Sequence, residues 1–410
     1  MADPLNDGPA DVKTVRNAIA FALHILGARL RWILQRSQSR QRVRYSIVLD
    51  GMPEVHLARA RVAPREYIPW LWIYAPVVLK WFALALRHGS LTLPTAANPR
   101  IVSGGFRGET KSSCLSQVGR AHQRWVARWT AVQLHGGLSS SARLRVAEQR
   151  ITASNLAYPL IVKPDIGACG YGVRLVRNTS ELSVYLTRFP PAQTVILQEY
   201  VPWHGEAGIF YVRDPGMKKG RIYSFGLRYY PHVVGDGRST LRQLIKADRR
   251  ASRRARLHFE TFAARLNEVP AKGSIVRLAT IASLRVGALY RDGSAHITSA
   301  LTERLDQIAK SMPEFHYGRF DLRFRTIDAL MQGKDFLIVE INGAGAEAIH
   351  IWDPELTIKD AYRTWFEQHE ILFAIAASNR ARGITPLSLR ELIVLQWRES
   401  RLLRRYPPSN

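Results

Sequence analysis

Cysteine is scarce in this chain, which holds only Cys114 and Cys169 among its 410 residues. Two cysteines cannot form the disulfide framework of a small secreted protein, so a reducing compartment is expected. The opening residues, MADPLNDGPADVKTV, lack the basic and then apolar pattern of a secretory signal. We therefore expect a cytoplasmic protein, with attachment to the inner face of the membrane as the alternative.

An uninterrupted apolar run of membrane-spanning length is also missing. Residues 67–86, YIPWLWIYAPVVLKWFALAL, have nearly the required length, but Pro69, Pro76 and Lys80 interrupt them. Prolines remove helical hydrogen bonds, and a lysine is costly within lipid. We expect this segment to join a soluble core. Attachment to a surface is the first alternative, and a membrane span is the second.

Acidic residues are few relative to basic ones. The sequence has 33 Asp and Glu against 59 Lys and Arg, a formal net charge of +26. Such an excess attracts anions, so an anionic substrate or a membrane surface is an expected partner. Arginine also accumulates with genomic base composition, and the arginine-rich stretch 248–256 is interpreted first as a solvated helix face, with an anion site as the alternative. A second arginine group lies at 398–405. No specific nucleic acid is predicted, and the oligomeric state is left open.

The chain divides into three parts by composition. Residues 1–119 form a divergent N-terminal region, with a basic amphipathic helix expected over 12–36 and a loop-like stretch rich in Gly, Ser, Thr and Pro over 92–119. Helix and strand patterns then alternate over 120–375, which predicts an α/β or α+β domain, and α+β is the class that we expect. Residues 376–410 contain a basic C-terminal helix.

A lysine and a glycine-rich loop follow an apolar strand over residues 158–172. The strand YPLIVK ends at Lys163, and PDIGACGYG places Gly167, Gly170 and Gly172 directly after it. A lysine can neutralise phosphate oxygens, and glycines let backbone N–H groups approach a polyphosphate. No Gly-Lys-Ser/Thr follows, so this is not a Walker loop. Alone, such a loop is more often a simple turn.

A second polar group lies in the segment LQEYVPWHGE, where a strand runs into a hinge. Gln198 and Glu199 lie at the end of the strand, and Glu206 lies beyond a hinge. Backbone groups at such a hinge can hydrogen-bond adenine, and the carboxylate beyond it can hold ribose hydroxyls.

Two further strands carry the remaining candidates. In HYGRFDLRF, Arg319 and Asp321 are two residues apart, as are Glu340 and Asn342 in FLIVEINGAG. Side chains two apart on a strand share one face. The oxygens of Asp321, Glu340 and Asn342 would suit a magnesium ion that also bridges substrate phosphates, with Arg319 beside the transferred phosphoryl group.

The order of these motifs resembles the ATP-grasp superfamily over residues 120–375, in particular D-alanine:D-alanine ligases and cyanophycin synthetases. The segment PHVVGDGRSTLRQLI, Pro231 to Ile245, is also similar to cyanophycin synthetases. The resemblance implies an ATP-grasp fold, in which two α/β subdomains clasp ATP. It also implies a carboxylate-amine ligase that forms an acyl phosphate, with an amino acid or a peptide as substrate.

The resemblance assigns roles to the motif residues. It places Lys163 and the loop Gly167–Gly172 on ATP phosphates, Gln198 and Glu199 at adenine, and Glu206 at ribose. Asp321, Glu340 and Asn342 would hold Mg²⁺, and Arg319 would stabilise the acyl phosphate. Lys111 is a further candidate for a phosphate or an acyl carboxylate, with an ordinary loop position as its alternative.

The sequence departs from D-alanine ligases at GAGAEA, which replaces the Ser-Pro-Gly that often follows the asparagine. This change argues against D-alanine specificity. Two other functions stay open: an ATP-grasp kinase that acts on a small hydroxyl compound, and a non-catalytic nucleotide-binding protein that docks to an anionic surface.

Overall fold

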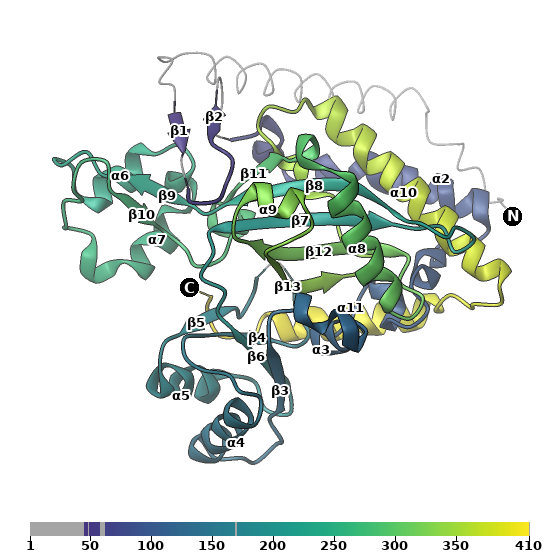
Figure 1. Cartoon of the computed structure of the whole chain (residues 1–410), viewed down its shortest axis with the longest axis horizontal. Helices are drawn as coiled ribbons and strands as arrows, with labels where there is room; N and C mark the ends of the chain where they lie inside the picture. Colours follow the sequence, from purple (N-terminus) through teal and green to yellow (C-terminus); the bar gives the residue numbers. More distant parts are fainter. Residues whose placement is uncertain (1–44, 48, 58–61, 169, 410) are drawn as a thin grey trace, which may run out of the picture.

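The computed structural model describes residues 45–47, 49–57, 62–168 and 170–409. A five-stranded and a four-stranded antiparallel sheet form its framework (Figure 1). Helices cover both sheets, and this mixture confirms the predicted α+β class. The helix predicted over residues 12–36 and Cys169 both lie outside the described residues.

The larger sheet has the strand order β11-β8-β7-β12-β13. Its strands are β7 (Gly205–Val212), β8 (Arg221–Tyr229), β11 (Leu289–Asp292), β12 (Tyr317–Phe324) and β13 (Phe336–Asn342). Because side chains alternate along a strand, the sheet has two different faces. Ile209 and Phe320 lie on its apolar face and pack with Leu301 and Leu305 of α8 (Ser299–Ser311). The polar side chains are thereby left on the opposite face.

The smaller sheet has the order β3-β6-β4-β5. Its strands are β3 (Trp129–Gln133), β4 (Leu160–Pro164), β5 (Arg174–Val176) and β6 (Thr194–Glu199). Helices α4 (Ser140–Ala153) and α5 (Thr179–Arg188) share with it a core that includes Val162, Leu186 and Leu197. This unit extends below the larger sheet in Figure 1.

Helix α2 (Trp70–His88) contains most of the aromatic segment that we expected in the core. Pro76 lies inside it and removes one helical hydrogen bond. The inner face, which includes Ile73 and Val77, packs with Trp365 of α10 (Ile358–Ala381), so tertiary contacts keep the helix continuous. The expectation that this segment joins the core is therefore correct for the inner face of the helix only. Among the described residues, α2 is the one helix long and apolar enough to cross a membrane.

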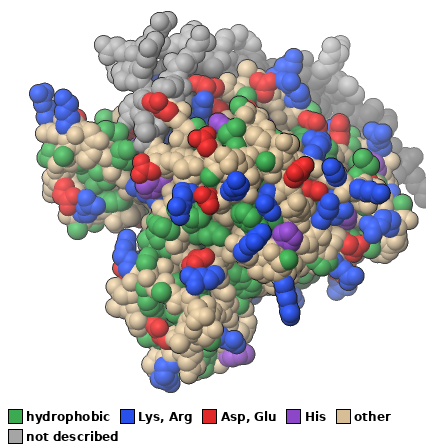
Figure 2. Space-filling view, in the orientation of Figure 1, with side chains coloured by type: hydrophobic (Ala, Val, Ile, Leu, Met, Phe, Trp, Pro, Cys, Tyr) green, Lys and Arg blue, Asp and Glu red, His purple; other side chains and the backbone are tan. Residues whose placement is uncertain are grey.

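Two other segments differ from the sequence expectation. Residues 92–119 contain the short helices η2 (Leu93–Ala96), η3 (Val102–Gly105) and α3 (Lys111–Ser116), where we expected a loop. The stretch 249–256 is not wholly solvated, because Arg250 is buried and its Nη1 lies 3.1 Å from Glu66 Oε1. Figure 2 shows Lys and Arg spread over the visible face of the molecule.

The remaining elements are short and form the periphery. They are β1 (Tyr45–Ile47), β2 (Val55–Leu57), β9 (His232–Val234), β10 (Ile275–Arg277), α6 (Leu241–Ala247), α7 (Ala255–Thr261), α9 (Ile327–Met331), η1 (Pro64–Tyr67), η4 (Arg120–Trp125), η5 (Ala251–Arg254), η6 (Ala263–Arg265), η7 (Leu284–Val286), η8 (Ser294–His296) and η9 (Ile349–Trp352).

The C-terminal helix α11 (Leu389–Leu403) begins at a capping box, in which Ser388 and Glu391 satisfy each other's backbone N–H groups. The chain then reaches the loop that follows β4. Tyr406 Oη donates to Ile166 O at 2.7 Å, and Ser409 Oγ donates to Gly170 O at 2.6 Å. The Tyr406 ring also stacks on Phe189 at 5.5 Å. The C-terminal segment therefore holds the glycine-rich loop.

Replacing Tyr406 with Phe should loosen this loop without changing the fold. The variant loses one hydrogen bond, so the free energy of unfolding should fall by about 1 kcal/mol. Amide hydrogen exchange over residues 166–172 should become faster, whereas exchange in β12 should not change. An unchanged exchange rate in the loop would show that Tyr406 does not restrain it.

Candidate functional site

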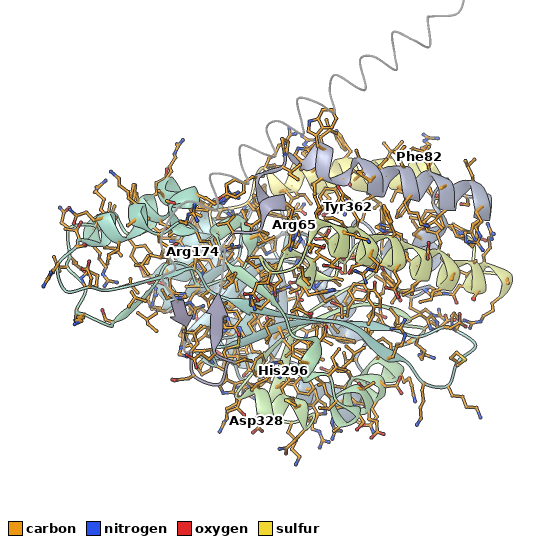
Figure 3. All side chains as sticks on the ribbon, turned by 90° about the horizontal axis from the view of Figure 1, so that it is seen from above. Arg65, Phe82, Arg174, His296, Asp328 and Tyr362 are labelled. Carbon is orange, nitrogen blue, oxygen red and sulfur yellow. The ribbon has the colours of Figure 1, made fainter. Side chains whose placement is uncertain are left out.

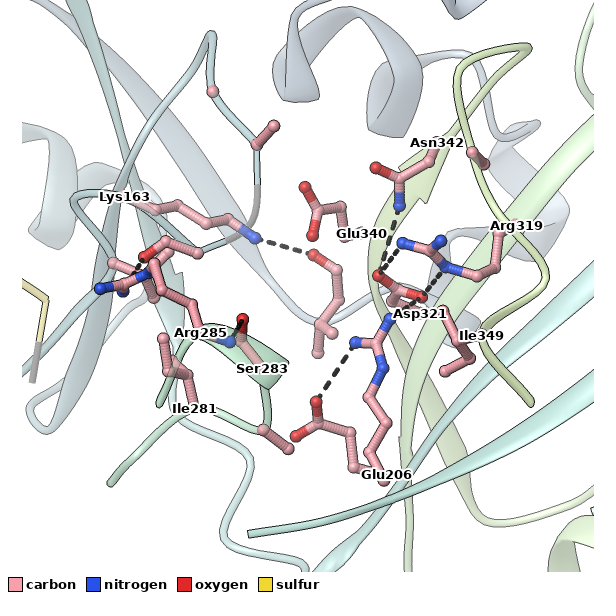
Figure 4. Close-up of a pocket in the computed structure, with 18 of the residues that line it drawn as sticks. Lys163, Glu206, Ile281, Ser283, Arg285, Arg319, Asp321, Glu340, Asn342 and Ile349 are labelled. Carbon is pink, nitrogen blue, oxygen red and sulfur yellow. Dashed lines mark hydrogen bonds and ion pairs between the residues drawn. The ribbon is translucent and has the colours of Figure 1, made fainter. Parts of the chain in front are cut away.

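A cavity of about 420 Å³ lies between the two sheets (Figure 4). Both sheets contribute polar residues to its wall. Ten of the eleven predicted site residues line it: Lys163, Gly167, Gly170, Gln198, Glu199, Glu206, Arg319, Asp321, Glu340 and Asn342. Gly172 belongs to the same loop but does not line the cavity.

Strand pairing brings the predicted metal ligands together on the polar face of the larger sheet. Asp321 lies opposite Glu340, and Arg319 lies opposite Asn342. On the other side of β12, Asp321 lies opposite Gly208. A Cβ atom at Gly208 would lie 2.9 Å from Arg319 Cδ and 3.0 Å from Asp321 Oδ1. A glycine at this position therefore leaves the space in which the arginine and the carboxylate meet.

Asp321 is held by two arginines. Its Oδ1 accepts from Arg319 Nε at 2.6 Å and from Arg228 Nη2 at 2.8 Å, and its Oδ2 accepts from Arg319 Nη2 at 3.1 Å. Burial alone would raise the pKa of this carboxyl, but the two guanidinium groups outweigh burial and hold the pKa below its ordinary value. Asp321 is therefore a permanent anion with fixed geometry.

Glu206, the predicted ribose ligand, already has three protein partners. Tyr230 Oη donates to its Oε2 at 2.5 Å, Arg323 Nε lies 3.2 Å from the same oxygen, and Arg228 Nη1 lies 3.3 Å from Oε1. A ribose hydroxyl would have to share the carboxylate with these donors. The Arg228 guanidinium joins Glu206 to Asp321.

Lys163 connects the two sheets across the cavity. Its Nζ donates to Gln198 Oε1 on β6 and to Val339 O on β13, each at 2.8 Å. Burial lowers the lysine pKa to about 8, although the Glu340 carboxylate acts in the opposite direction. The ammonium group therefore lies between the strands that carry the adenine and metal candidates.

The N-terminal region also reaches the site. Lys111 Nζ donates to Gly167 O at 2.7 Å and lies 3.4 Å from Glu340 Oε1. Glu109 lines the cavity, and its Oε2 is buried without a hydrogen-bond partner among the described residues. Burial raises the pKa of Glu109 to about 8. Lys111 is thus placed beside the glycine loop and a predicted metal ligand, rather than in an ordinary loop position.

Glu199 faces the cavity edge with its carboxylate already engaged. Arg128 donates to it from its backbone N at 2.7 Å and from Nε at 2.8 Å. The side chain is therefore positioned by Arg128, the residue directly before β3.

Sequence reasoning missed several residues of the cavity wall. Arg228, Tyr290, Arg323, Glu109, Glu347 and Trp352 all line it. Arg323 continues the period-two series of Arg319 and Asp321, so the spacing already contained a signal for it. Glu347 lies in the GAGAEA segment directly after Asn342, but nothing in that segment marked its carboxylate as a wall residue.

The donor atoms of the predicted metal ligands determine whether the site suits Mg²⁺. The side chains of Asp321, Glu340 and Asn342 carry hard oxygen atoms on two paired strands, the donor type that this ion takes. Both Asp321 oxygens already accept from arginine, and Oδ2 also accepts from Asn342 Nδ2 at 3.3 Å, so Mg²⁺ would have to share this carboxylate. The described residues contain no cluster of three or more His, Cys, Asp or Glu side chains suited to a metal. Phosphate oxygens and water would therefore have to complete the coordination, as is usual for Mg²⁺ at nucleotide sites.

Comparison with known proteins gives two sequence relatives, and no family model matches. Cyanophycin synthetases from Trichormus variabilis and a Nostoc species are each 24% identical over 212 residues, covering 47% of this chain and 23% of theirs. The chain therefore matches about a quarter of the length of these curated relatives.

Solved structures give similarities at low TM-scores. A bifunctional glutathione synthetase from Pasteurella multocida has a TM-score of 0.33 and 16% identity, covering 63% of this chain and 36% of that one. The D-alanine-D-alanine ligase from Coxiella burnetii has a TM-score of 0.36 and 11% identity, with 72% and 62% covered. A D-cycloserine synthetase has a TM-score of 0.36 and 15% identity, with 76% and 81% covered.

The sequence relatives agree with the resemblance stated from the motifs. The structure adds two antiparallel sheets that enclose one cavity and bring those motifs together. The chain is therefore similar over about half of its length to cyanophycin synthetases, and the residues of the motifs that carry the resemblance line one cavity.

Proposed function

We propose that this protein is an ATP-dependent ligase that joins a carboxylate to an amine through an acyl phosphate. One observation carries the proposal: Lys163, Arg319, Asp321, Glu340 and Asn342 line a single cavity between the two sheets. An ammonium group, a guanidinium group and hard oxygen donors are the groups that phosphoryl transfer to a carboxylate requires.

In the first step, a carboxylate oxygen of the acid substrate attacks the γ-phosphorus of ATP, and the bond to the β-phosphate oxygen breaks to release ADP. The Lys163 ammonium would bind phosphate oxygens, and Arg319 would bind the developing acyl phosphate. Mg²⁺ held by Asp321, Glu340 and Asn342 would offset the negative charge of the phosphates.

In the second step, the amine nitrogen attacks the acyl carbon and inorganic phosphate leaves. The nitrogen loses its proton to solvent or to the released phosphate. The glycine-rich loop and the C-terminal segment that holds it would exclude water from the acyl phosphate, which water otherwise hydrolyses.

Helix α2 supports a separate proposal about location. Its outer side exposes seven large apolar residues: Trp70, Leu71, Trp72, Val78, Leu79, Phe82 and Leu86. Figure 3 shows Phe82 on the outer side of the helix, while Tyr362 lies toward the interior. Soluble monomers rarely expose so large a contiguous apolar surface.

We propose that this side of α2 binds the surface of an anionic membrane. Tryptophan and tyrosine favour the lipid-water interface, and basic residues attract anionic headgroups. The Arg253 guanidinium lies over the exposed Tyr67 ring at 4.2 Å, beside the start of the helix, and Arg87 is exposed near its end. The net charge of +26 acts in the same direction.

Replacing Glu340 with Gln should leave the fold intact and lower turnover about 100-fold, because one metal oxygen and its charge are lost. Turnover is measured as ADP release with pools of acids and amines, and hydroxylamine traps any acyl phosphate as a hydroxamate. Glu268→Gln, at an exposed position away from the cavity, is the control. ADP formed with a hydroxyl compound and no hydroxamate would indicate a kinase. Absence of ADP in every pool would indicate a non-catalytic nucleotide-binding protein.

ATP affinity should decrease as the pH rises through about 8, because Lys163 has a pKa of about 8 and binds phosphate only as an ammonium. Calorimetry between pH 6.5 and 9.5 measures this dependence. Lys163→Arg should retain affinity across the range, since arginine stays charged, and Lys163→Ala should be weak throughout. An affinity of the native protein that does not change with pH would contradict the phosphate role of Lys163.

Membrane binding should fall more than tenfold when Trp70, Leu79 and Leu86 are all replaced with Ser, because the inserted apolar area is lost. Co-sedimentation with vesicles of phosphatidylcholine and phosphatidylserine measures binding. Met217→Ser, at an exposed position outside α2, is the matched control, and ATP affinity should be equal in all variants. Failure of the native protein to bind these vesicles would exclude the membrane proposal.

A further inference from the structure

Glu347 differs from the other acidic residues of the cavity wall in the way it is held. It lies five residues after Asn342, and its Oε1 accepts from Tyr74 Oη at 2.8 Å and from Trp365 Nε1 at 2.6 Å. Its Oε2 accepts from Trp352 Nε1 at 2.8 Å. All three donors are uncharged, so they orient the carboxylate without neutralising it.

Most other acidic groups of this wall have a cationic partner. Asp321 pairs with Arg228 and Arg319, Glu206 pairs with Arg228, and Glu340 lies near Lys111. Among the residues that the structure describes, no Lys, Arg or His forms such an ion pair with Glu347.

Two further glutamates of the wall, Glu109 and Glu399, also lack an ion pair within the described part of the chain. They differ from Glu347 in their surroundings. Burial raises the pKa of Glu109 to about 8, so this carboxyl is mainly neutral at pH 7. Glu399 lies on α11 and accepts from the backbone N of Gly108 at 3.2 Å. Neither is surrounded by aromatic donors.

The surroundings of Glu347 are suited to an organic cation. Trp352 lines the cavity, and its ring lies 6.0 Å from that of Trp365 at an angle of 80°. Tyr74 lies 5.3 Å from the same Trp365 ring. A carboxylate with a free lone pair beside an indole attracts a cation both by charge and by the negative face of the ring.

Glu347 also lies next to the proposed reaction centre. Arg319, which binds Asp321, donates through Nη1 to the backbone O of Glu347 at 2.9 Å. The wall continues through Ile349 to Trp352. A substrate bound at the Glu347 carboxylate is therefore close to the arginine that would hold the acyl phosphate, where the attacking nitrogen must lie.

We infer that Glu347, together with Trp352, binds a side-chain ammonium or guanidinium group of the amine substrate, distinct from the nitrogen that reacts. This inference rests on the proposed ligase function and specifies its acceptor as a basic amino acid or a peptide that carries one. The contact from Tyr74 gives α2, in the divergent N-terminal region, a part in forming this subsite.

The test measures binding rather than turnover, so it does not depend on identifying the acid substrate. Calorimetry on the full chain with ADP and Mg²⁺ compares L-arginine with its uncharged analogue L-citrulline, and L-lysine with L-norleucine. At least one cationic probe should bind the native protein about tenfold or more tightly than its neutral partner. Equal binding within both pairs would overturn the inference, even if the ligase assay succeeds.

Variants then show whether Glu347 causes the preference for cationic over neutral probes. Glu347→Gln removes the charge and should abolish the difference between cationic and neutral probes, while ADP affinity stays unchanged. Glu303→Gln is the matched control, because it makes the same chemical change at an exposed position of α8 outside the cavity wall, and it should retain the preference. If Glu347→Gln does not fold, Glu347→Asp keeps the charge with a shorter reach and should weaken the cationic probe more than the neutral one. A preference that survives Glu347→Gln would place the cation elsewhere.

Discussion

The buried carboxylate of Asp321 is the group on which the geometry of the cavity depends. An isolated buried anion is costly, and removing one partner of a buried ion pair costs roughly 3–5 kcal/mol, so Asp321 requires its arginines. Arg228 then extends the network to Glu206, and Arg319 extends it to the backbone of Glu347. One connected set of charges therefore fixes the proposed nucleotide side and the proposed acceptor side of the site relative to each other.

The larger sheet and the grouping of its polar residues could be predicted because both depend on local periodicity. Residues two apart share a face on any strand, so Arg319 and Asp321 had to point together, as did Glu340 and Asn342. The alternation of helix and strand patterns narrowed the class to α/β or α+β, and the antiparallel strand pairing of the structure decides between them. The metal, nucleotide and catalytic roles of these residues stay predictions.

Other parts of the site could not be predicted, because they depend on contacts between distant segments. Glu347 accepts hydrogen bonds from Tyr74 on α2 and Trp365 on α10, which are 273 and 18 residues away in the sequence. Nothing in the sequence pairs Tyr406 with Ile166, or Lys111 with Gly167. Helix α2 continues through Pro76, although a proline removes one helical hydrogen bond. Burial of apolar side chains against α10 stabilises the helix by more than the loss of that bond destabilises it.

These long-range contacts bear on the predicted division of the chain at residues 119/120 and 375/376. The N-terminal part supplies Lys111 beside Glu340, and Tyr74 beside Glu347. The C-terminal part supplies Glu399 to the cavity wall and Tyr406 to the glycine-rich loop. A fragment limited to residues 120–375 would lose the Lys111 partner of Glu340, the Tyr74 donor to Glu347 and the restraint on the loop. The composition boundaries therefore separate segments of different sequence character that together build a single site.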